Sequence, residues 1–146
     1  MAVGFTLYRI MLADHHTTLR QGLKRILEEK QDLEVIGEAG DGNELLSLLR
    51  ASKLQPHMVV LDISMPNLSG VEAARQIKKI YPGIKVLMLS MHREEEYFDH
   101  AFSAGADGYL LIEDADRELF SAIDKIRQGK VYVSPLLSGK PSGERG

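Results

Sequence analysis

Five short apolar runs alternate along the chain with segments of helical periodicity. The runs are apolar over most of their length rather than alternating, and each ends at a polar residue or a turn signal, which is typical of parallel strands covered on both faces. The stretches between the runs repeat apolar residues at the spacing of one helix face. This alternation predicts an α/β fold with a parallel sheet, right-handed crossovers and helices on both faces. The runs are Arg9–Ala13, Leu33–Ile36, Met58–Leu61, Lys85–Leu89 and Tyr109–Ile112.

Residues at the ends of the expected helices support this interpretation. Ser69 is placed to cap the third helix, and Gly105 and Gly129 stand where helices end in a left-handed residue. A chain of 146 residues has the length of one domain. We therefore expect an overhang over residues 1–7, one folded domain over residues 8–134, and a linker or tail over residues 135–146, which are rich in Gly, Ser and Pro.

The composition excludes several classes of protein. The sequence has no cysteine, which excludes a disulfide scaffold, a cysteine nucleophile and a thiolate metal site. A net charge of -3 is unlike that of a duplex DNA-binding domain. No apolar stretch approaches the ~20 residues of a membrane helix, and the N-terminus lacks the pattern of a signal peptide. We expect a soluble, cytoplasmic protein with no membrane partner.

Polar residues follow four of the five runs. Because the carboxyl ends of parallel strands lie at one edge of a sheet, these residues are expected to gather there. The sequence thus places carboxylates, hydroxyls and imidazoles together. They are Asp14, His15 and His16 after the first run, Asp62 and Ser64 after the third, Ser90 and His92 after the fourth, and Glu113 and Asp114 after the fifth.

Asp62 is the sharpest of these signals. It directly follows the run Met58–Leu61, which is expected to be central and buried, and it precedes a loop with Pro66 and Gly70 as turn residues. A carboxylate in that place suits a nucleophile toward a phosphoryl group. The alternative is a loop aspartate that makes a local turn hydrogen bond, and spacing alone gives the two interpretations equal weight.

Asp14 also allows two interpretations. It either orders the entry to the first helix, or it holds a cation together with Asp62. Carboxylates at adjacent strand ends repel each other, and a hard cation with oxygen ligands is the usual compensation, which favours Mg²⁺ held by both aspartates and a loop carbonyl. The segment Asp14–His16 lacks the Gly, Ser and Thr of a phosphate cradle, which argues against flavin binding.

With these motifs in order, the chain resembles the receiver domains of two-component response regulators, and most closely those of NarL/LuxR-type transcription factors. The resemblance runs from about residue 8 to about residue 134. It implies a flavodoxin-like (βα)5 fold, a doubly wound parallel sheet in three α/β/α layers with strand order 2-1-3-4-5. The matching stretches are Ile10–His16, Val35–Gly42, Val59–Gly70, Val86–Ser90 and Gly105–Leu111.

The resemblance also implies roles for individual residues. Asp62 matches the aspartate that accepts a phosphoryl group from a sensor histidine kinase. Asp14, Asp62 and the backbone carbonyl of Ser64 match the family's Mg²⁺ ligands.

Three further positions match residues that respond to phosphorylation or set its lifetime. Ser90 matches the hydroxyl that turns toward the phosphoryl oxygens, and Tyr109 matches the aromatic ring that moves inward with it. The side chains of Ser64 and His92 match positions that tend to set the rate of dephosphorylation.

Two positions depart from the family pattern. The second acid of the family is His15 here, and the lysine that follows the fifth strand is Ile112. The first change removes a charge from the metal site, so Mg²⁺ binding is expected to be weak. The second removes a cation that would pair with the phosphoryl oxygens, so both changes should slow phosphoryl transfer and blunt the switch.

The histidines leave a second metal hypothesis open. Imidazole suits transition metals better than it suits Mg²⁺. A site built by His15, Asp14 and Asp62, with His16 and His92 nearby, is therefore a lesser alternative for such an ion. The competing interpretation is that His16 caps or packs and that His15 is a degenerate position.

Two functions follow from these observations. The first is a phosphoryl receiver, a regulatory domain with at most weak phosphotransfer and autodephosphorylation activity. Its expected partners are a sensor histidine kinase, a second copy of the chain in a dimer, and DNA only through a helix-turn-helix output domain that lies outside this sequence. The alternative is a pseudo-receiver, an interaction or dimerisation module that works without phosphorylation.

Overall fold

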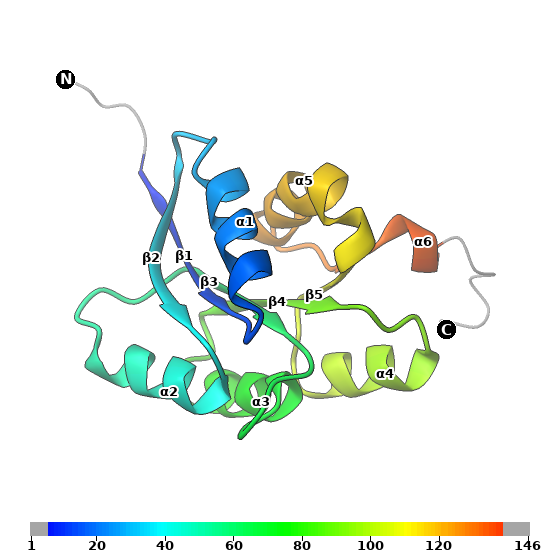
Figure 1. Ribbon diagram of the computed structural model, residues 1–146, viewed down its shortest axis with the longest axis horizontal. Coiled ribbons are helices and arrows are strands. Elements are labelled where there is room, and N and C mark those ends of the chain that lie inside the picture. Colours follow the sequence, from blue (N-terminus) through cyan, green and yellow to red (C-terminus); the bar gives the residue numbers. More distant parts are fainter. Residues whose placement is uncertain (1–5, 139–146) are drawn as a thin grey trace.

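Within residues 6–138, which the computed structural model describes, six parallel strands form one central sheet (Figure 1). Their order is β2-β1-β3-β4-β5-β6, so the first five strands have the order implied by the family resemblance. The strands are β1 (Tyr8–Ala13), β2 (Leu33–Ala39), β3 (Met58–Asp62), β4 (Lys85–Ser90), β5 (Gly108–Leu111) and β6 (Tyr132–Val133).

Helices cover both faces of the sheet, as the alternating pattern predicted (Figure 1). Successive strand side chains point to opposite faces, so each face contributes its own apolar core. A 3-10 turn, η1 (Ile112–Asp114), joins β5 to the following helix. On one face lie α1 (Thr17–Leu27) and α5 (Ala115–Arg127), and on the other lie α2 (Gly42–Ala51), α3 (Gly70–Ile80) and α4 (Glu95–Ser103).

The structure corrects the sequence prediction at the C-terminal end. We expected five strands and a tail from residue 135, but β6 adds a sixth strand that pairs in parallel with β5. The short helix α6 (Pro135–Ser138) then buries Leu137, which is 2% exposed. A strand of two residues is too short to appear as an apolar run, which is why the pattern missed it. Residues 1–5 and 139–146 of the expected overhang and tail lie outside the described residues.

The predicted helix boundaries are confirmed. The Ser69 hydroxyl accepts a hydrogen bond from the backbone N–H of Glu72 at 3.2 Å and caps α3. Gly105 and Gly129 have φ angles of 99° and 85°, the left-handed region in which glycine costs least. None of the helices among the described residues is long and apolar enough to cross a bilayer.

All five residues of β3 are buried, because β3 lies inside the sheet between β1 and β4 and is covered by helices on both faces. This strand carries Asp62 at its carboxyl end. A buried inner strand of the sheet therefore positions Asp62, the residue that carries the sharpest signal in the sequence.

Candidate functional site

Two carboxylates end neighbouring strands at the carboxyl edge of the sheet. Asp62 is the last residue of β3, and Asp14 follows β1, whose Ala13 lies opposite Leu61 of β3. The two aspartates are 6% and 1% exposed. Because neighbouring parallel strands end at the same edge of a sheet, the side chains at their carboxyl ends lie close together. The structure thus brings the two aspartates together at the edge where the sequence placed them.

The loop after Asp62 folds back tightly against the end of the strand. A Cβ atom at Gly70 would lie 2.1 Å from the backbone oxygen of Asp62, so only glycine fits this close approach. Asn67 has a φ of 66°, and its side-chain amide donates to the Asp41 carboxylate at 2.7 Å. The loop is thereby fixed so that the backbone N–H of Ser64 donates to Oδ1 of Asp62 at 3.1 Å.

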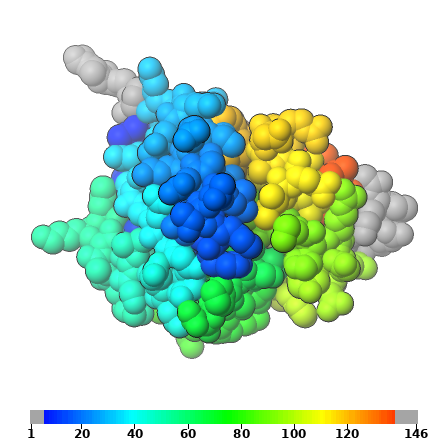
Figure 2. Space-filling model, viewed as in Figure 1, coloured from blue at the N-terminus to red at the C-terminus, as the bar shows by residue number. Residues whose placement is uncertain are grey.

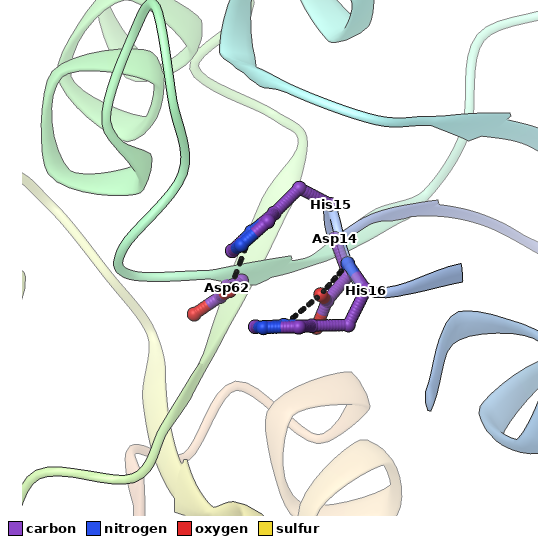
Figure 3. Close-up of side chains that lie close together, drawn as sticks. All are labelled: Asp14, His15, His16 and Asp62. Atoms are coloured by element: carbon purple, nitrogen blue, oxygen red, sulfur yellow. Dashed lines mark hydrogen bonds and ion pairs between the residues drawn. The ribbon is translucent and has the colours of Figure 1, made fainter. Parts of the chain in front are cut away.

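Four side chains converge at this edge (Figure 3). One potential ligand atom from each of Asp14, His15, His16 and Asp62 lies within 4.8 Å of the others. Nδ1 of His15 is 3.7 Å from Oδ2 of Asp62, and Nδ1 of His16 is 3.1 Å from Oδ1 of Asp14. The imidazoles are 39% and 52% exposed, so they form the outer side of the cluster while the carboxylates form its floor.

The surroundings of Asp62 disfavour a negative charge on its carboxyl group next to the charge of Asp14. Burial raises the pKa of Asp62, and the neighbouring Asp14 raises it as well, against the lowering effect of the Ser64 N–H and the two histidines. A cation or a proton at this place would relieve the repulsion between the two carboxylates.

Asp14 keeps one carboxylate oxygen without a partner. Its Oδ1 accepts from the backbone N–H of His16 at 2.8 Å, whereas Oδ2 is buried and has no hydrogen-bond partner among residues 6–138. Arg20 on α1 contacts Asp14, but its Nη1 donates to the backbone oxygen of Asp14 and its Nε pairs with Glu38 at 3.1 Å. Sequence reasoning missed Arg20, because one arginine on a surface helix carries no distinguishing signal.

Ser90 and Tyr109 form a second, buried part of the site. Both are 0% exposed, and the Tyr109 hydroxyl lies 2.9 Å from Oγ of Ser90 and 2.9 Å from the backbone oxygen of His92. The backbone N–H of His92 donates to the same Oγ at 2.9 Å. Phe98 of α4 packs edge-on against the Tyr109 ring, with 5.6 Å between centroids. Tyr109 thus points inward and links the end of β4 to α4.

A cleft of about 590 Å³ opens beside Asp62 and the two histidines. Its walls include the apolar side chains of Leu19, Met91 and Ile112, together with Ser64 and His92. Ile112 therefore lines the cleft with an apolar side chain. The space-filling view shows the blue start of α1 beside the yellow start of α5 on this face (Figure 2).

His92 lies outside the cluster of Asp14, His15, His16 and Asp62. Its ring stacks on Tyr97 with 3.9 Å between centroids and an angle of 8° between planes. Its Nδ1 is 3.8 Å from a carboxylate oxygen of Glu94. His92 lines the cleft as predicted from the sequence, but it is oriented by the start of α4.

The fold and this edge of the sheet define a flavodoxin-like α/β domain with its polar residues at the strand ends. The response regulator receiver domain model matches residues 10–124. The transcriptional regulatory protein DegU of Brevibacillus brevis is 41% identical over 131 residues, which cover 89% of this chain and 54% of DegU. The response regulator GacA of Pseudomonas protegens is 35% identical over 130 residues, 89% of this chain and 60% of GacA. This chain therefore spans little more than half the length of these relatives.

Solved structures agree with the family match. A LuxR-family two-component response regulator from Aurantimonas sp. SI85-9A1 superposes with a TM-score of 0.88 at 34% identity, covering 96% of this chain and 99% of that one. The non-phosphorylated receiver domain of RcsB from Escherichia coli has a TM-score of 0.80 at 24% identity, covering 88% and 98% of the two chains, which supports the fold alone.

This chain belongs to the response regulator receiver domain family. Its relatives are two-component regulators of the NarL/LuxR group, as the sequence motifs implied. It is a regulatory domain of a family whose members bind Mg²⁺ at the acidic phosphorylation site, and in this chain Asp14, His15, His16 and Asp62 form a group of side chains that could hold a metal ion.

Proposed function

We propose that this chain is the phosphoacceptor domain of a two-component transcriptional regulator and that Asp62 accepts a phosphoryl group from a sensor histidine kinase. The position of Asp62 carries this proposal: it is a buried carboxylate at the end of the central strand, beside Asp14 and open to the cleft. The relative DegU is named as a transcriptional regulatory protein, which supports transcription as the regulated process. The output domain proposed here, a helix-turn-helix DNA-binding domain outside this sequence, is the one that the family resemblance implies.

In the proposed reaction a carboxylate oxygen of Asp62 forms a bond to phosphorus, the bond between phosphorus and the kinase imidazole breaks, and the kinase histidine leaves. The Ser64 N–H holds Oδ1 of Asp62, which leaves Oδ2 on the side of His15. Asp14, Asp62 and the backbone carbonyl of Ser64 would hold Mg²⁺, which neutralises charge on the phosphoryl oxygens when bound. Two carboxylates where the family has three predict weak Mg²⁺ binding.

We propose that Ser90 and Tyr109 change conformation when Asp62 is phosphorylated and transmit this change to the surface of the domain. The Ser90 Oγ already accepts the His92 N–H, so its own proton is available to a phosphoryl oxygen. The Tyr109 hydroxyl has one proton and two acceptors at 2.9 Å, and it can keep the backbone bond when Ser90 turns away. Ser64 and His92 line the cleft and are proposed to set the rate at which water removes the phosphoryl group.

A pseudo-receiver remains the second candidate function, and specific observations favour it. Ile112 offers no cation to the cleft, and His15 replaces the second acid of the family pattern. With fewer contacts that distinguish the phosphorylated state, the chain gains less from phosphorylation, because a ligand shifts an equilibrium only by its differential affinity for the two states. Such a chain would signal through dimerisation or a protein partner.

The experiment that separates the two functions is addition of beryllium fluoride and Mg²⁺, followed by two-dimensional amide NMR. A phosphoacceptor is expected to show resonance shifts around Asp62 and Ser90, and the Asp62→Asn variant is expected to show none. If wild type and Asp62→Asn respond alike, the phosphoacceptor proposal is wrong.

Restoration of the two family residues gives the matched test of the departures. The double variant His15→Asp with Ile112→Lys is expected to respond at lower beryllium fluoride concentration than wild type. An unchanged response would show that these two residues do not limit the reaction.

A further inference from the structure

The cluster at the end of β1 and β3 contains more nitrogen than a magnesium site uses. Two imidazoles, His15 and His16, and two carboxylates, Asp14 and Asp62, meet there. Mg²⁺ prefers octahedral oxygen ligands, whereas a mixed set of imidazoles and carboxylates is typical of Zn²⁺ and its neighbours in the first transition row. The donor types therefore point away from the hard cation of the family.

The separations between the donors fit a tetrahedral ion. With metal–ligand distances of about 2.1 Å, neighbouring ligand atoms in a tetrahedron lie about 3.4 Å apart. The two nitrogen–oxygen separations in the cluster, 3.1 Å for His16 with Asp14 and 3.7 Å for His15 with Asp62, lie on either side of that value. The widest separation is 4.8 Å, so closing the site requires a movement on the order of 1 Å.

Binding of an ion requires movement of the His15 and His16 imidazoles, which are the more exposed side chains of the cluster. The side chains of His15 and His16 are 39% and 52% exposed, whereas those of both aspartates are buried. Figure 3 shows the ring of His15 beside the Asp62 carboxylate and the ring of His16 beside that of Asp14, and the exposed fractions place both rings on the solvent side. The floor of the site is thus preformed, and the outer ligands close over an ion that enters from the cleft.

Asp14 supplies an independent reason to place a cation here. Its Oδ2 is buried and lacks a hydrogen-bond partner in the described part of the chain. Leaving such an oxygen unsatisfied costs more than a typical hydrogen bond contributes. Arg20 does not neutralise it, because Arg20 donates to the backbone oxygen of Asp14 and to Glu38. Ile112 places no ammonium group in the cleft.

We propose that Asp14, His15, His16 and Asp62 form a binding site for a divalent transition-metal ion of the Zn²⁺ type. This goes beyond the proposed phosphoacceptor function and does not require it, since the site needs no phosphoryl group. His15 is the residue that changes the preference: with an acid in its place, three carboxylates would favour Mg²⁺, and with an imidazole the set favours the softer ion.

The test is a Zn²⁺ titration of the chain, purified without a polyhistidine tag and stripped with a chelator. Isothermal calorimetry gives the stoichiometry and the affinity, and long-range nitrogen–proton NMR of the imidazoles identifies the ligands. We expect one Zn²⁺ per chain, with ring shifts at His15 and His16 and little change at His100. His100 is an exposed histidine on α4 outside the cluster.

Single substitutions separate this site from surface binding. His15→Gln and His16→Gln are each expected to weaken Zn²⁺ binding at least about tenfold, because even residues that only support a ligand contribute that much. His100→Gln is the matched control and is expected to leave the affinity unchanged. Both target histidines are half exposed, so the variants should fold, which circular dichroism verifies.

His15→Asp provides the opposite test. It is expected to weaken Zn²⁺ binding and to strengthen Mg²⁺ binding in the same protein, which a merely structural role of His15 would not produce. The proposal is overturned if wild type shows no stoichiometric Zn²⁺ binding. It is also overturned if His100→Gln weakens binding as much as His15→Gln, or if His15→Asp leaves the preference for the two ions unchanged.

Discussion

Replacing Asp62 with asparagine is expected to stabilise the folded chain at neutral pH. One ligand oxygen of Asp62 lies within 4.8 Å of one of Asp14. Two unit charges at that distance repel by about 3.5 kcal/mol at an effective dielectric constant of about 20. The nearby histidines and water in the cleft offset part of this repulsion. We therefore expect Asp62→Asn to raise the free energy of unfolding by about 1–2 kcal/mol, with the Ser64 N–H bond retained by the amide oxygen.

The pH dependence of this gain follows from the raised pKa of Asp62. When the Asp62 carboxyl is protonated in both the folded and the unfolded chain, it does not lower the free energy of unfolding. The free energy of unfolding begins to fall as pH rises past the unfolded pKa of about 3.9, and the loss is complete above the higher pKa of the folded state. The advantage of Asp62→Asn should therefore be largest near neutral pH and fall toward zero on acidification.

The assay is urea unfolding with a chelator present, near neutral pH and at a pH below about 3.9. Asp99→Asn, an exposed aspartate on α4, is the control and is expected to change stability by less than about 0.5 kcal/mol. If Asp62→Asn is no more stable than wild type at neutral pH, or if its advantage does not shrink in acid, the account of the carboxylate pair is wrong.

Three further predictions test other parts of the structure. Tyr109→Phe removes a buried hydroxyl that bonds Ser90, so urea unfolding should show a loss of about 0.5–1.5 kcal/mol with the fold retained. Gly70→Ala places a methyl group against backbone atoms and should cost more than about 2 kcal/mol, whereas Gly22→Ala in the open middle of α1 should gain about 0.5–1 kcal/mol. Burial and then two arginines lower the pKa of His57, so the unfolded chain takes up the proton first and stability should fall as pH drops below about 6.5. His57→Gln should flatten that slope in urea unfolding measured across the same range.

Most of the fold was predictable because the apolar pattern repeats over the first five strands and the helices that follow them. Runs such as Met58–Leu61 are buried on both faces, and covered parallel strands need that continuous character. The pattern failed at Tyr132–Val133, where two residues are too few to show a period and pairing with β5 decides the structure. It failed also at Leu137, whose burial depends on contacts that no local signal records.

The candidate site was partly predictable for a related reason. Asp14 and Asp62 end neighbouring strands, so topology alone brings them together. The unpartnered oxygen of Asp14 and the role of Arg20 were not predictable, because side-chain rotamers and not strand order decide them. The inward position of Tyr109 likewise depends on packing against α4.

The most direct test of the central claim is the intact mass of the chain after incubation with a small-molecule phosphodonor and Mg²⁺. The proposed function predicts that wild type gains the mass of one phosphoryl group, that the gain is lost on hydroxylamine treatment as for an acyl phosphate, and that Asp62→Asn gains nothing. A wild-type mass that stays unchanged, or an equal gain in Asp62→Asn, would contradict phosphorylation of Asp62 and leave the pseudo-receiver as the function.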